Sequence, residues 1–89
     1  NNEPETVKFM VYPLNELNPG DTAEVVWIIS DSFMSSQLDA LGFTFKERVT
    51  CILGNRRDSM NAYLIRGTLI ALRTENAKEV LVRALEPSS

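Results

Sequence analysis

Short runs of β-branched and aromatic residues, separated by turn residues, restrict the fold more than any other feature of this sequence. Runs of alternating apolar and polar residues are typical of strands, and the intervals here are too short for the helical crossovers that parallel strands need. We therefore expect one mostly β domain with one short helix, folded into a small antiparallel barrel. The predicted strands span residues 22–30, 48–53, 62–66, 69–73 and 79–85, with a further short strand ended by Pro13.

The run over residues 22–30 is apolar on both of its faces. Val26 and Ile28 lie on one face, and the opposite face is expected to hold Ala23, Val25, Trp27 and Ile29. A strand with two apolar faces is usually central in its sheet or curls around a barrel.

Two turns are expected at glycine positions. The segment 18–21 reads Asn-Pro-Gly-Asp, in which Gly20 can adopt the positive φ that such a turn needs. Gly67 and Thr68 separate the runs 62–66 and 69–73 by two residues, which is typical of a type II′ hairpin turn.

A helix of about three turns is expected after the first long strand, because residues 30–32 offer good N-caps. Its apolar face is predicted to pack on the sheet through Met34, Leu38 and Leu41. Gly42 can end the helix in the left-handed region, with Phe43 placed to contact Leu38 as in a Schellman motif.

The composition argues against several chemistries. With no histidine and only Cys51, the chain lacks the clustered ligands of zinc or iron sites, and no imidazole is present to activate a nucleophile. Its four glycines are isolated, so no phosphate-binding loop is evident. The longest apolar run, residues 25–29, is too short to cross a bilayer. We expect no enzyme activity, no cofactor, no bound metal and no membrane insertion.

Charge is distributed unevenly along the chain. The net charge is −3, yet the segment 46–73 holds six basic and only two acidic side chains, which suggests a docking face for an acidic partner. Arg56 and Arg57 are the strongest candidates within it, because they fall in a loop between two predicted strands. Solvated charges that keep strand edges soluble are the alternative explanation. The acidic remainder argues against nucleic-acid binding.

Three groups of residues stand in an order and spacing that resembles the ferrous-iron transport protein A (FeoA) family. The resemblance extends from about Leu14 to Leu85 and rests on order and spacing, because no single group is specific. Their plain structural roles would be core anchors, a helix stop, turns and strand positions. The groups are Leu14, Leu17 and Gly20; then Leu38, Asp39, Ala40, Leu41, Gly42 and Phe43; then Arg66, Gly67, Ala71, Leu72, Arg73 and Ala77.

The resemblance implies both a fold and a role. FeoA-like proteins are small cytoplasmic SH3-like barrels that accompany the membrane GTPase permease FeoB in bacterial ferrous-iron uptake. It implies a barrel domain over residues 14–86, preceded by a tail or edge strand over residues 1–13. The expected role is that of a non-enzymatic cytoplasmic accessory protein that binds and modulates a FeoB-type permease. Two alternatives stay open: the SH3-like regulatory domain of a metal-dependent transcriptional repressor, and a generic peptide-binding barrel.

The chain departs from the family pattern at positions that would help to identify its partner. Basic residues commonly precede the helix-end leucine, where Ser35, Ser36 and Gln37 stand here, and a Pro-Gly step is common where Phe45 and Lys46 stand. A Gly-Asp-Pro-like loop is replaced by residues 56–59. The predicted binding face combines the helix over residues 31–41, including Ser35 and Gln37, with the loop around Arg56 and Arg57.

Overall fold

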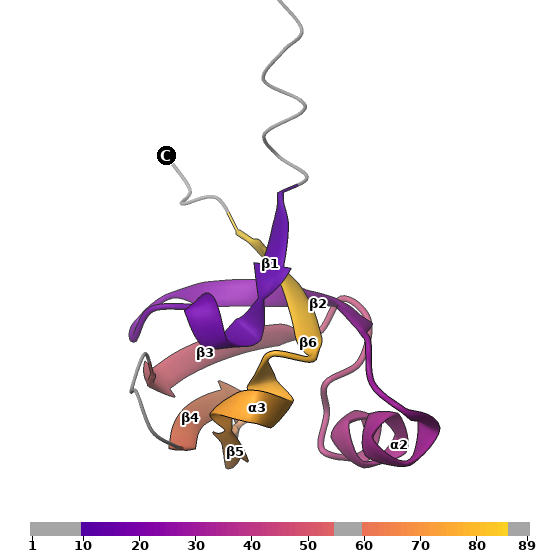
Figure 1. Ribbon diagram of the computed structural model, residues 1–89. Helices are drawn as coiled ribbons and strands as arrows, with labels where there is room; N and C mark the ends of the chain where they lie inside the picture. Colours follow the sequence, from indigo (N-terminus) through magenta and orange to yellow (C-terminus); the bar gives the residue numbers. More distant parts are fainter. Residues whose placement is uncertain (1–9, 55–59, 86–89) are drawn as a thin grey trace, which may run out of the picture.

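The computed structural model describes residues 10–54 and 60–85, which form six strands, one longer helix and two short helical turns (Figure 1). The strands are β1 (Val11–Pro13), β2 (Thr22–Ile28), β3 (Arg48–Leu53), β4 (Met60–Ile65), β5 (Thr68–Arg73) and β6 (Val80–Ala84). The helical elements are η1 (Leu14–Glu16), α2 (Ser32–Ala40) and α3 (Thr74–Ala77).

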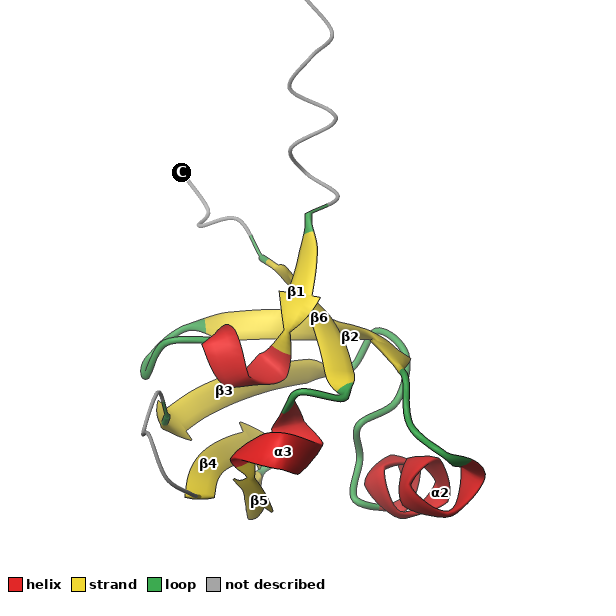
Figure 2. Ribbon diagram, viewed as in Figure 1, coloured by secondary structure: helices red, strands yellow, loops and turns green. Residues whose placement is uncertain are grey.

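The strands form one antiparallel sheet in the order β1-β6-β2-β3-β4-β5. The sheet curls strongly: β2 and β3 run side by side, β6 and β1 continue the sheet beyond β2, and β4 and β5 continue it beyond β3. Helix α3 lies beside β4 and β5, and α2 stands off to one side (Figure 2). β1 and β5 are the two edges and do not pair with each other, so the sheet stays open. The predicted mostly β, antiparallel fold with one short helix is confirmed.

The core lies inside the curled sheet. Four of the leucines that carry the family resemblance are buried there, namely Leu14, Leu17, Leu38 and Leu72. Among residues 10–54 and 60–85, the buried apolar side chains are Leu14, Leu17, Ala23, Val25, Leu38, Phe43, Val49, Cys51, Tyr63, Ile65, Leu72, Ala77, Val80 and Val82.

Helix α2 is capped at both ends by the residues that its sequence offers. The Asp31 side chain accepts a hydrogen bond from the Met34 N–H at 2.9 Å. At the other end, the N–H of Gly42 donates to the Asp39 carbonyl and the N–H of Phe43 donates to the Leu38 carbonyl, both at 3.0 Å. These two bonds define a Schellman motif, and Gly42 has the positive φ of +114° that the motif needs.

The predicted apolar face of this helix is wrong at one position. Leu38 is buried and Met34 packs partly against the core, but Leu41 is 42% exposed. The reason is that the helix ends at Ala40, so Leu41 serves as the C-cap. The reversal at Gly42 then brings Phe43 into the core.

Strand β2 is central, as predicted, but the expected partition of its faces fails after Val25. The register with β6 shifts between Val25 and Trp27, which marks a β-bulge. A bulge adds one residue to the strand and inverts the alternation beyond it. Consequently Ile28 packs against the core, whereas Trp27 and Ile29 are exposed. The strand also ends at Ile28 rather than at residue 30.

The hairpin between β4 and β5 turns one residue earlier than predicted. Ile65 pairs with Thr68, so Arg66 and Gly67 form the turn, and both have positive φ (+53° and +76°). Two positive φ values define a type I′ turn rather than type II′. A positive φ is uncommon for a residue other than glycine, so the sequence gives no sign that Arg66 belongs to the turn.

Two predicted features fall partly or wholly outside the described residues. The N-terminal strand is described only over Val11–Pro13, and residues 1–9 lie outside; Arg56 and Arg57 also lie outside. Within residues 10–54 and 60–85, no helix is long and apolar enough to cross a bilayer.

Candidate docking surface

An open groove lies between α2 and the second half of β2. Its volume is about 470 Å³, and we call it the α2 groove. The residues that line it are Val25, Val26, Trp27, Ile28, Ser32, Ser35, Ser36, Asp39, Phe43, Thr44 and Phe45. Val26 and Phe45 also line a smaller neighbouring pocket of about 200 Å³ that reaches Val11 on β1. The two hollows therefore share a wall and form one extended surface.

The β-bulge in β2 supplies the first exposed aromatic side chain of this surface. Because alternation inverts after Val25, Trp27 turns out of the core and 64% of it is exposed. An exposed tryptophan is unusual for a side chain that is mostly apolar, and aromatic anchors of this kind dominate binding energy at protein interfaces. Trp27 is therefore the leading candidate for a contact residue.

A tight turn after α2 supplies the second exposed aromatic side chain, that of Phe45. The Thr44 carbonyl accepts a hydrogen bond from the Glu47 N–H at 2.9 Å, with Phe45 and Lys46 at the turn's centre. Lys46 has a φ of +73°, so the turn is type II, in which glycine is preferred at this position. Phe45 is 68% exposed, and the Lys46 ammonium lies 5.7 Å from the centre of its ring.

These two positions are those at which the FeoA-like pattern has Pro-Gly. Proline and glycine are the residues that a type II turn favours at its two central positions. This chain instead keeps the same turn with Phe45 and a strained Lys46. The turn therefore exposes an aromatic ring beside a cation where a Pro-Gly step would expose neither.

The polar side of the α2 groove comes from the helix. Ser32, Ser35 and Ser36 supply hydroxyl groups, and Asp39 is the one ionisable side chain that lines the groove. An apolar wall facing hydroxyls and a carboxylate suits an apolar segment that carries a hydrogen-bond donor or a cation.

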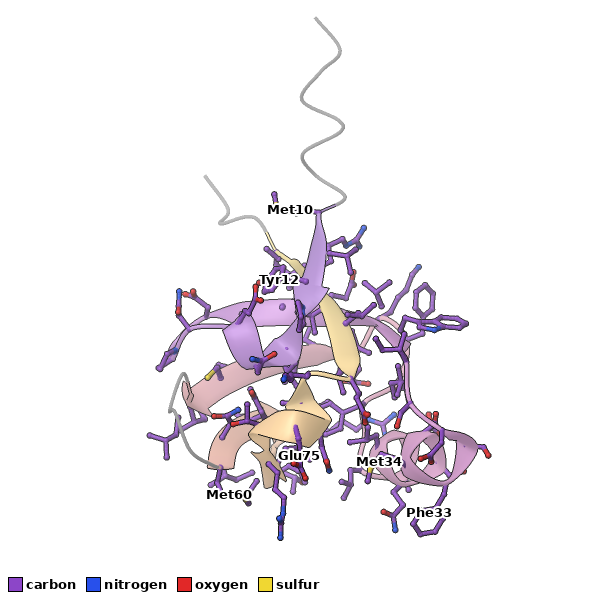
Figure 3. The ribbon with its side chains drawn as sticks, viewed as in Figure 1. Met10, Tyr12, Phe33, Met34, Met60 and Glu75 are labelled. Atoms are coloured by element: carbon purple, nitrogen blue, oxygen red, sulfur yellow. The ribbon has the colours of Figure 1, made fainter. Side chains whose placement is uncertain are left out.

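Phe33 completes the exposed aromatic set but does not line the groove. It is 70% exposed and projects away from the body of the molecule (Figure 3). Met34, one residue on, turns instead toward α3, where the Asn76 amide donates to its sulfur at 3.9 Å. Phe33, Phe45 and Trp27 are the three most exposed large apolar side chains of the described residues.

The buried titratable groups lie away from this surface. Burial raises the pKa of the Cys51 thiol, and Asp21 raises it further. Burial also raises the pKa of Tyr63 far above its usual value, and its hydroxyl donates to the Leu14 carbonyl at 3.4 Å. Among residues 10–54 and 60–85, no three side chains of the metal-binding types gather into a site.

The structure describes only part of the predicted binding face, which combines Ser35 and Gln37 on α2 with Arg56 and Arg57. Ser35 lines the α2 groove, whereas Gln37 is exposed on the helix and outside the lining. Arg56 and Arg57 follow β3 outside the described residues. Arg56 and Arg57 therefore stay a separate prediction.

Sequence reasoning missed Trp27 and Phe45 as contact candidates; Asp39 lies within the predicted helical part of the binding face but was not singled out. Trp27 was assigned to a regular strand face, because a bulge leaves no trace in simple alternation. Phe45 and Lys46 were noted as departures from the family pattern, and that departure was the available signal.

A model of the FeoA domain matches residues 12–84, most of the chain. The chain belongs to the FeoA domain family. A crystal structure of an iron uptake regulatory protein (FeoA) superposes with a TM-score of 0.79 at 28% identity, covering 85% of this chain and all of that one. Stenotrophomonas maltophilia FeoA, solved with zinc, has a TM-score of 0.71 at 27% identity, covering 79% of this chain and 87% of that chain.

The family model shows the family, and these solved structures agree with it in architecture. The S. maltophilia protein is described as a prokaryotic SH3 domain protein, so the open antiparallel sheet seen here is an SH3-like barrel. FeoA proteins are small accessory domains of this kind and not enzymes, in agreement with the sequence analysis. No curated protein sequence gives a significant match.

The same fold occurs within a longer protein. A manganese-dependent transcriptional repressor superposes with a TM-score of 0.76 at 22% identity. The match covers 86% of this chain but only 43% of the repressor. At this identity the likeness concerns the fold alone, whereas the family model assigns the chain to the FeoA domain family.

Proposed function

We propose that this protein is a non-enzymatic accessory protein of bacterial ferrous-iron uptake that binds the cytoplasmic side of a FeoB-type GTPase permease and modulates it. Its family membership links it to ferrous-iron transport, and the permease as partner is what the family resemblance implies. A cytoplasmic location follows from the proposed role.

The observation that carries the proposal is the α2 groove with its exposed aromatic walls. Trp27 and Phe45 are two of the three most exposed large apolar side chains of the described residues, and they lie at the same groove. Both side chains line the groove, and Lys46 is held in a strained conformation beside them. Strain and exposure at one place indicate a surface shaped for a partner.

The groove also indicates what the permease should offer. Asp39 and the α2 serines face the aromatic wall, so the bound segment should carry an apolar side chain for Trp27 and a basic or amide group for Asp39. The bound protein would modulate the permease if it binds one conformation of this segment better than another, because a ligand shifts a conformational equilibrium only through differential affinity.

Binding to the purified cytoplasmic region of a FeoB-type permease from the same organism tests this proposal. Trp27→Ala and Phe45→Ala should each weaken the complex by tenfold or more, since buried aromatic anchors often contribute at least ~2 kcal/mol. Phe33→Ala is the matched control, because it removes an equally exposed ring from the same region that does not line the groove. Equal effects of all three changes, or no complex with the parent chain, would refute the proposal.

A repressor role has less support from this chain. The repressor match is under one quarter identical and covers less than half of that protein, whereas the FeoA match extends over the whole length of its counterpart. No feature of the α2 groove favours the repressor alternative.

A further inference from the structure

The two edges of the sheet differ in their capacity to pair with another strand. β1 has three residues and ends at Pro13, which has no backbone N–H to donate. β5 has six residues without proline, and its register with β4 runs from Met60–Arg73 to Ile65–Thr68 without a bulge. Short length, proline and bulges are the usual protections of an edge strand, and β5 has none of them.

The hairpin geometry determines which backbone groups of β5 face outward. In a two-residue hairpin the residues that flank the turn, here Ile65 and Thr68, form a hydrogen-bonded pair, and the pairing alternates from there. The backbone groups of Thr68, Ile70 and Leu72 therefore point toward β4. Those of the remaining three residues point to the open edge, namely Leu69, Ala71 and Arg73, and all three residues are exposed.

We propose that the β5 edges of two copies of this chain pair antiparallel about a two-fold axis at Ala71, so that one sheet runs through a homodimer. In this register Ala71 faces Ala71 of the second copy, and Leu69 faces Arg73. Opposite residues share a face of the sheet, so the aliphatic stem of Arg73 can cover Leu69, which is 61% exposed.

Charge permits this pairing. Arg73 is the one charged residue of β5, and the two copies of it would lie four residues apart along the strands, about 13 Å. That separation exceeds the screening length of about 8 Å at physiological salt. The small side chain of Ala71 leaves room at the axis, where the two copies of this residue face each other.

Pairing of β5 with β5 of a second copy fits this edge better than pairing of β5 with β1 of a second copy. Pairing β5 with β1 of another copy would meet Pro13 and only three residues, and it would build an open chain of molecules. Pairing β5 with β5 satisfies the outward groups of both copies at once and closes as a dimer. The residues of this interface are distinct from those that line the α2 groove, so the α2 groove of each copy stays open in the dimer.

Sedimentation equilibrium and concentration-dependent amide exchange test the proposal together. The chain should dimerise as its concentration rises, and exchange should slow at the amides of Leu69 and Ala71 while those of Ile70 and Leu72 keep their rates. This alternation is specific to edge pairing, since other interfaces would not protect every second residue. A monomer at every concentration up to about 1 mM, or a dimer without the alternation, would overturn the proposal.

A pair of variants at the axis sharpens the test. Ala71→Pro removes an outward N–H without removing a bond to β4, so it should raise the dimer dissociation constant at least tenfold, whereas Ala71→Ser should stay within twofold of the parent. Leu69→Lys repeats the test with a charge at the edge if the proline variant does not fold. Leu64→Lys is the control for face-to-face packing, because Leu64 lies opposite Leu69 on the outer face but on β4. Loss of the dimer in Leu64→Lys with retention in Ala71→Pro would refute edge pairing.

Discussion

Replacing Gly42 with alanine should destabilise the fold by a predictable amount. The added methyl group would cause backbone strain at this position without a steric clash. A Cβ built at Gly42 would meet its nearest neighbour, the Arg66 Cδ atom, at 3.5 Å, and Ile65 at 3.6 Å, which are ordinary contacts. The cost is therefore the positive φ of +114°, about 1–2 kcal/mol for an L-residue, offset by about 0.4–1 kcal/mol from the stiffer unfolded chain. We expect Gly42→Ala to lower the free energy of unfolding by about 1 kcal/mol.

Denaturant titration followed by circular dichroism measures this loss, and a thermal melt should show a decrease of about 4–8 °C. Gln37→Ala is the control on the same helix, because Gln37 is exposed and alanine is a good helix former; its midpoint should match the parent. If Gly42→Ala also unfolds at the parental midpoint, the Schellman ending does not determine how α2 returns the chain to the core.

Three further outcomes are expected. Burial raises the pKa of Cys51 and Tyr63, so at high pH the folded state holds protons that the unfolded state releases. The free energy of unfolding should therefore be constant at neutral pH and fall as pH rises past about 9 to 10. In urea titrations, Tyr63→Phe should reduce this fall by up to about 1.4 kcal/mol per pH unit. The purified chain should retain no ferrous iron or zinc in anaerobic equilibrium dialysis, and one tightly bound equivalent would contradict this. Reversal of Arg56 and Arg57 to glutamate should slow association with the permease region mainly at low salt, and unchanged kinetics there would remove these residues from the docking surface.

The sequence was sufficient for the parts of the fold that local chemistry determines. Asp31 caps a helix because its carboxylate reaches a free N–H, and Gly42 ends it because other residues resist positive φ. Alternating apolar residues placed every described strand to within a few residues. These features depend on a few neighbours along the chain, so they can be inferred before the fold is known.

The groove could not be predicted in the same way, because it depends on register between strands. Whether Trp27 faces the core or the solvent is decided by a bulge opposite Leu81, a residue distant in sequence. Arg66 and Lys46 both adopt positive φ although glycine is favoured there, since the surrounding strands impose the turn. Local preference was overruled at each of these sites by pairing across the sheet.

Chemical-shift mapping tests the central claim most directly. The backbone amides and the Trp27 indole N–H of the labelled chain would be followed while the cytoplasmic region of a FeoB-type permease is added. The account predicts that the largest shifts occur at Trp27, Ser35 and Phe45, with little change at Leu69 on the β5 edge. Shifts concentrated on β5, or none at Trp27 and Phe45 while a complex forms, would contradict the assignment of the α2 groove as the docking surface.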